Sequence, residues 1–127
     1  MKMYEIVELA NLYDRIKDYK MPLKTSYKFS ILMRQVEREM RFYQEEFAKI
    51  IQAYGKYENG KLVYSEDGEA IIIIPGKEQE CNSKIVELKN LEVDIKDVDF
   101  TFSEIECLDN LEFTVSEMAC LLPLIKI

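Results

Sequence analysis

The strongest constraint on the fold is a set of apolar residues that recurs at steps of three and four over one stretch of the chain. These residues, called the seam below, are Phe29, Leu32, Val36, Met40, Tyr43, Phe47 and Ile50, and Tyr54 continues the spacing. The spacing is close to the heptad repeat of a coiled coil. It predicts a helix from Pro22 to Tyr54, which Gly55 ends. At 1.5 Å per residue, such a helix is roughly 50 Å long.

A shorter helix is predicted before it, from about Met3 to Tyr19. Its apolar residues share one face: Ile6, Leu9, Tyr13 and Ile16. At about 25 Å it covers only half of the seam. The other half of the seam must then pack on the C-terminal region of the chain or on another protein molecule. This difference in length is the reason to predict self-association or a protein partner, with cover inside one chain as the alternative.

The middle of the chain carries β signals. Turn dipeptides at Asn59-Gly60 and Asp67-Gly68 flank short β-prone runs, which predicts that 62–64 pairs with 69–74 as a hairpin. Residues 71–74 are four consecutive isoleucines. A strand with one buried face alternates, so this unbroken run predicts a strand that is covered on both faces.

The C-terminal part mixes helix and extended chain. We expect a helix over about 78–91, an extended segment over 92–102 with a slip at Lys96-Asp97, and a turn of helix from Ser103. Thr114 and Glu117 fit a capping box that opens a short helix, which Pro123 stops. The sequence therefore predicts one α+β domain over 1–127. It has a long N-terminal helical hairpin (1–55), and an acidic α+β portion (56–127) with a small β-hairpin and a C-terminal helix/strand segment.

Charge is unevenly distributed along the chain. The net charge is −7, but residues 1–55 hold ten Lys/Arg against eight Asp/Glu, whereas residues 56–127 hold seven against sixteen. An acidic C-terminal half repels phosphate backbones, so we expect no direct contact with nucleic acid. The same asymmetry permits self-association or mimicry of a polyanion.

Residue types argue against catalysis. The chain has no histidine, which removes the most common general base and zinc ligand, and its four glycines form no phosphate-binding motif. The three cysteines lie far apart and are expected to be small buried apolar residues. We therefore predict no catalytic residues, no metal, no cofactor and no enzymatic activity.

Two groups of charged residues are candidate binding sites. The acidic group comprises Glu92, Asp94, Asp97 and Asp99. Such carboxylates can bind a divalent ion or a small ligand, or they form the solvated face of a strand. The basic stripe comprises Arg34, Arg38 and Arg41, which lie within about 60° of one another on a helix. It is either a docking surface for an acidic partner or a solvated face.

The sequence also bears on location. Apolar stretches such as 70–75 are far shorter than the roughly 20 residues that cross a bilayer. The N-terminal segment carries acids among its apolar residues and lacks the features of a signal peptide. We therefore expect a cytoplasmic protein without a membrane partner.

Three stretches together resemble a known group of proteins. They are "IKDYKMPLKTSYKFSILMRQVEREMRFYQEEFAKIIQAYG", "YENGKLV" and "LEFTVSEMACLLPLI". Over most of its length the chain resembles small hypothetical proteins of phages and prophages of Gram-positive, Clostridium-like bacteria, a family of unknown function. The resemblance implies a phage-encoded protein in the host cytoplasm. It brings no catalytic residues, because none are established for the family.

These observations predict a non-enzymatic phage accessory protein that acts through protein–protein interaction, with self-association through the seam. One alternative is an acidic mimic of nucleic acid that inhibits a host defence protein. A second alternative is a small-ligand or metal binder that uses the acidic group.

Overall fold

The computed structural model describes residues 1–108 and 111–126, and its fold is α+β. The chain forms two compact units. Unit 1 combines Met1–Arg41 with Glu92–Ile127, and unit 2 is Phe42–Leu91. The boundary between the units lies inside the longest helix, α2 (Leu23–Tyr54). The two portions expected from the sequence, 1–55 and 56–127, instead meet at the end of this helix.

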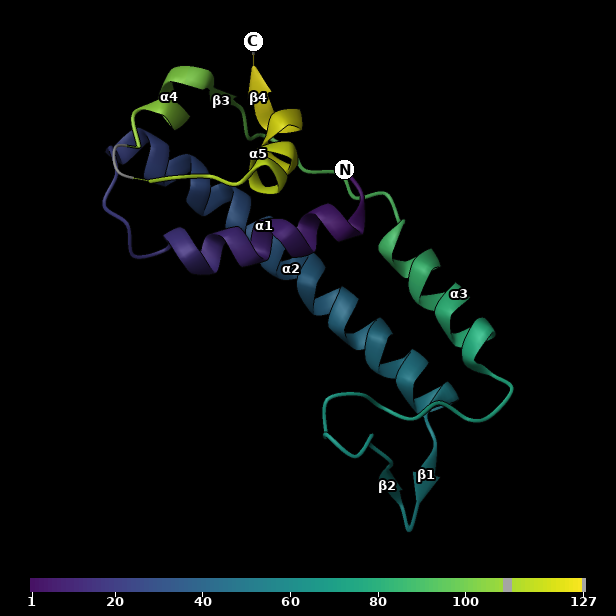
Figure 1. The fold of residues 1–127 in the computed structure, drawn as a ribbon. Helices are drawn as coiled ribbons and strands as arrows, with labels where there is room; N and C mark the ends of the chain where they lie inside the picture. The colour runs from purple at the N-terminus through teal and green to yellow at the C-terminus, as the bar shows by residue number, and fades with distance from the viewer. Residues whose placement is uncertain (109–110, 127) are drawn as a thin grey trace. The chain divides into compact units, whose positions relative to one another are not determined.

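Unit 1 is built from the N-terminal helices and the C-terminal segment (Figure 1). Besides the first half of α2, its elements are α1 (Met3–Ile16), β3 (Phe100–Thr101), α4 (Phe102–Glu106), α5 (Val115–Leu121), η1 (Leu122–Leu124) and β4 (Ile125–Lys126). The short strands β3 and β4 pair in parallel, with Phe100 opposite Ile125. Helix α1 ends three residues earlier than predicted, and α2 begins one residue after Pro22.

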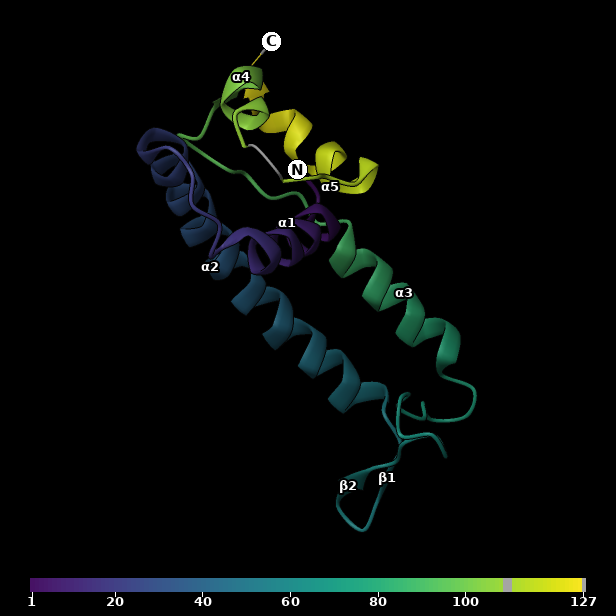
Figure 2. The ribbon, with the colours of Figure 1, turned by 60° about the vertical axis from the view of Figure 1, so that its left-hand side comes forward.

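The core of unit 1 is closed by the apolar faces of α1 and α2. In Figures 1 and 2, α1 crosses the first half of α2, and α1 also packs against α5. The buried side chains of the two long helices are Met3, Ile6, Leu9, Leu12, Ile16, Phe29, Leu32, Met33 and Val36. Their spacing is the three-and-four pattern seen in the sequence, so the helical period predicted this face correctly.

Unit 2 contains the second half of α2, the hairpin of β1 (Tyr57–Glu58) and β2 (Lys61–Leu62), and α3 (Glu78–Lys89). Asn59 and Gly60 both have positive φ, at 52° and 76°, as a two-residue hairpin turn requires. Figures 1 and 2 both show α3 running back alongside the second half of α2. Every residue of unit 2 is described, and its buried apolar side chains are those of Cys81 and Leu88 alone.

The isoleucine run forms part of the predicted hairpin, but the prediction that both faces of its strand are covered is wrong. A bridge joins Ile71 to Tyr64, and a second joins Ile73 to Gly55. Ile72 and Ile74 remain 36% and 39% exposed. Within unit 2, no element closes over the face of the strand that bears these two side chains.

The extended segment after α3 is more irregular than predicted. Only Phe100–Thr101 forms a strand, and Glu92 adds an isolated bridge to Lys2. The predicted slip is present, because Asp97 has a φ of 61° and breaks the alternation. The Gln35 side chain holds this bend, donating to the Lys96 carbonyl at 2.7 Å and accepting from the Lys96 N–H at 2.9 Å.

Gly55 gives a test of the junction between α2 and the hairpin. A Cβ at this position would lie 2.6 Å from the Ile51 carbonyl oxygen and 2.7 Å from Cδ2 of Leu62. Because the first of these neighbours is backbone, it cannot move aside cheaply. We expect Gly55→Ala to destabilise unit 2 by about 1–3 kcal/mol. Faster amide exchange across 42–91 than in the wild type would show this, whereas unchanged exchange would contradict it.

Candidate functional site

The structure divides the predicted seam into two parts. Phe29, Leu32 and Val36 are 4%, 0% and 1% exposed and belong to the core of unit 1. They are occupied within the chain, which removes them from the predicted interaction surface. The remaining seam residues are half-buried: Met40, Tyr43, Phe47 and Ile50. The candidate interaction site therefore lies on the second half of α2.

The seam residues of unit 2 form a continuous apolar face. The rings of Tyr43 and Phe47 contact each other one turn apart, with centroids separated by 5.9 Å. Ile50 and Tyr54 extend the face towards the hairpin, and both are half-buried. With only Cys81 and Leu88 fully buried in these 50 residues, unit 2 leaves most of its apolar side chains in partial contact with water.

A groove of about 210 Å³ lies between α2 and α3. It is lined by Phe42, Glu46, Ile50, Lys84, Glu87, Leu88 and Leu91. Small-molecule sites are usually about 300–1,000 Å³, so this groove is smaller than a typical ligand pocket. Its lining combines apolar side chains with the charged side chains of Glu46, Lys84 and Glu87.

The basic stripe is exposed on the half of α2 that belongs to unit 1. Arg34, Arg38 and Arg41 are all exposed. Arg38 lies 3.9 Å from Glu39, and across 1–108 and 111–126 neither Arg34 nor Arg41 takes part in an ion pair. The stripe therefore keeps most of its positive charge at the surface, where an acidic partner can reach it.

The acidic group does not come together as a ligand set. Glu92 pairs with the Lys2 ammonium at 2.7 Å, Asp94 lies 3.7 Å from Lys96, and Asp99 lies 3.4 Å from Lys126. A hydrogen bond from Lys2 lowers the pKa of Glu92, the opposite of what clustered carboxylates would do. Asp97 is exposed at the bend. Among the described residues, no three His, Cys, Asp or Glu side chains are arranged to hold a metal ion.

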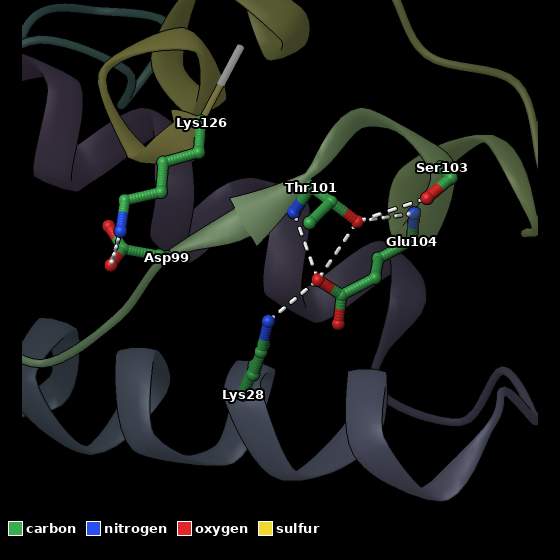
Figure 3. A network of polar contacts seen from close by, with 6 residues as sticks. All are labelled: Lys28, Asp99, Thr101, Ser103, Glu104 and Lys126. Atoms are coloured by element: carbon green, nitrogen blue, oxygen red, sulfur yellow. Dashed lines mark hydrogen bonds and ion pairs between the residues drawn. The ribbon is translucent and has the colours of Figure 1, made fainter.

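Another carboxylate, that of Glu104, lies at the centre of a polar network that the sequence analysis did not predict (Figure 3). Its Oε1 accepts hydrogen bonds from the Lys28 ammonium at 2.6 Å and from the Thr101 N–H at 2.9 Å. The Lys28 hydrogen bond is the main reason that the pKa of Glu104 falls to about 2. Its Oε2 is buried, and no described residue donates to it. The network ties α4 to α2 inside unit 1.

Arg15 ties α1 to α5 and to the segment before α5. Its guanidinium donates two hydrogen bonds to the Glu117 carboxylate, both at 2.9 Å, and one to the Glu112 carbonyl at 2.6 Å. Burial works against ionisation of Glu117, but the hydrogen bonds from Thr114 and Arg15 outweigh it and lower its pKa. Thr114 and Glu117 also form the predicted capping box. Arg15 and Glu117 therefore neutralise each other's charge across the contact between α1 and α5.

One local signal in the sequence could have predicted part of the Glu104 network. Thr101 and Glu104 have the same spacing as the recognised capping box, and they cap α4 in the same way. The contribution of Lys28 had no local signal, because it lies 76 residues away in the chain.

Two of the three cysteine thiols are buried. Burial raises the pKa of Cys81 and raises that of Cys120 to about 11, so both are protonated at neutral pH. Cys107 is exposed, which corrects the expectation that all three cysteines are buried.

Comparison with known proteins found no matching family model, no matching curated protein and no matching solved structure. None of the helices in 1–108 and 111–126 combines the length and apolar character that crossing a bilayer requires.

Proposed function

We propose that this chain is a non-enzymatic protein–protein interaction module that self-associates through the second half of α2. The contact surface comprises the unit 2 part of the seam: Tyr43, Phe47 and Ile50. We also propose, on the sequence resemblance alone, that the chain is phage-encoded and has an accessory role in the host cytoplasm.

The observation that carries the proposal is the unequal distribution of buried apolar residues. A unit of 50 residues rarely supports itself when only two apolar side chains are fully buried. The half-buried residues of α2 follow the spacing of a coiled-coil seam, which is the pattern that a second helix of the same kind covers. Burying them against another copy would give unit 2 the core that it lacks.

The two alternatives gain less support. A nucleic-acid mimic needs free carboxylates, yet five of the acids between 92 and 117 are paired with Lys or Arg: Glu92, Asp94, Asp99, Glu104 and Glu117. A carboxylate-based ligand site needs acids that converge, and the acidic group is spread along a bend with separate lysine partners. No specific observation favours either alternative.

Phe47→Glu tests the proposal. A charge placed in the centre of an apolar interface loses most of the binding energy, so we expect the dissociation constant to rise about 100-fold, equivalent to about 2.7 kcal/mol. Sedimentation equilibrium over a concentration series measures this constant. Far-UV circular dichroism of the variant checks that α2 still forms.

Ala48→Glu is the matched control, because residue 48 is exposed and faces away from the seam. It adds the same charge one residue later and should leave the dissociation constant within about twofold of the wild type. A wild type that remains monomeric at every concentration would contradict the proposal. Equal effects of the two substitutions would show that the seam is not the interface.

A further inference from the structure

The isoleucine run has one free edge. On the inner edge, the Ile72 N–H donates to the Val63 carbonyl at 2.9 Å, and the Ile72 carbonyl accepts from the Lys56 N–H at 2.8 Å. The Ile74 N–H donates to the Tyr54 carbonyl on the same edge. The N–H and carbonyl groups of Ile71 and Ile73 point to the opposite edge, and no described residue bonds to them.

This free edge is complementary to itself. Ile71 and Ile73 are equally spaced about Ile72, so a two-fold axis at Ile72 places Ile71 of one copy opposite Ile73 of the other. In an antiparallel pair, residues opposite each other in this way exchange both of their backbone hydrogen bonds. Two such pairs would form about four hydrogen bonds and satisfy the N–H and carbonyl groups of Ile71 and Ile73 in both copies.

The side chains favour the same arrangement. Ile72 and Ile74 are 36% and 39% exposed on one face of the strand. At the two-fold axis, Ile72 of each copy would face its equivalent at the short cross-strand distance of a non-hydrogen-bonded pair. β-Branched residues pack well in such pairs, so the pairing would also bury the apolar surface that the single chain exposes.

We infer that the free edge of 71–74 pairs, antiparallel and about a two-fold axis, with the same edge of a second copy of this chain. The inference builds on the proposed self-association and adds a second contact, separate from the α2 surface. The pairing is closed, because the inner edge is already occupied by residues 54–56 and 63–65. It leaves no further edge of this strand from which a fibre could grow.

The distinguishing measurement is amide exchange of ¹⁵N-labelled protein at concentrations below and above its dissociation constant. We expect the amides of Ile71 and Ile73 to gain at least tenfold protection when the protein associates. The Ile72 amide, which is bonded within the chain, should be protected at both concentrations. Amides of Ile71 and Ile73 that exchange rapidly in the associated protein would overturn the inference.

Ile73→Pro gives an independent test. Proline removes an N–H that has no partner within the chain, and proline is tolerated at strand edges. We expect its dissociation constant to rise at least tenfold with little change in helix content. Ile73→Val keeps the N–H and the β-branched shape, and should leave the dissociation constant within about twofold.

The two sites can be separated by comparing these variants with Phe47→Glu. If Phe47→Glu dissociates the protein and Ile73→Pro does not, the α2 interface holds and the strand pairing is overturned. If only Ile73→Pro dissociates it, the strand pairing holds and the α2 interface fails. If the wild type is monomeric throughout, both are overturned. Amides of Ile71 and Ile73 that are protected equally at all concentrations would show a partner inside the chain and would also overturn the pairing.

Discussion

Replacing Phe100 with alanine is expected to destabilise unit 1 by about 3–5 kcal/mol, the largest effect predicted for a single substitution here. Phe100 is fully buried, and its ring lies 4.7 Å from that of Phe29, centroid to centroid. It also begins β3, which pairs with β4 near the C-terminus. The alanine variant would lose the apolar burial and the aromatic contact, and would leave a cavity between α2 and the C-terminal segment.

Urea unfolding followed by circular dichroism measures this loss, and amide exchange of the helix α1 assigns it to unit 1. Phe102→Ala is a matched control, because this phenylalanine lies two residues later and is 58% exposed. Its truncation should cost less than about 1 kcal/mol. Equal losses of stability in the two variants would contradict the placement of Phe100 in the core of unit 1.

The helices could be predicted from the sequence because their signals are local. The seam spacing gave the bounds of α2 to within one residue, and Pro22 and Gly55 marked its ends. The α3 helix and the capping box at Thr114 were found in the same way. These signals depend on neighbours within a few residues, so no knowledge of tertiary contacts was needed.

What could not be predicted depends on residues far apart in the chain. The seam has one unbroken period, so nothing in it indicates that Val36 is buried in one unit while Phe47 is half-buried in another. For Ile72 and Ile74, apolar character predicted burial, but burial requires a second element over that face and the sequence cannot supply its position. The acidic group forms no common ligand set for a similar reason. Its carboxylates pair with separate lysines, and two of these, Lys2 and Lys126, lie near the opposite ends of the chain.

The free energy of unfolding of unit 1 should depend on pH through the ionisation of Glu104. Its pKa falls from an ordinary value of 4.5 to about 2, because the Lys28 ammonium and the Thr101 N–H bond to the charged form. A carboxyl whose pKa is lowered by folding stabilises the native state above pH 4.5 and loses this contribution as the pH falls towards 2. The side chain is 13% exposed, so solvent screens part of the interaction, and we expect a contribution on the order of 2 kcal/mol.

Glu104→Gln isolates this charge, because the glutamine carbonyl can still accept the Thr101 N–H and keep the cap of α4. The variant should be less stable than the wild type by about 2 kcal/mol at pH 7, and the difference should shrink as the pH falls from 5 to 2. Glu106→Gln removes the same charge from an exposed site on the same helix and controls for net charge. Urea unfolding at a series of pH values gives both curves. A difference between Glu104→Gln and the wild type that persisted unchanged at pH 2 would mean that lost packing, and not the ion pair with Lys28, accounts for the role of Glu104.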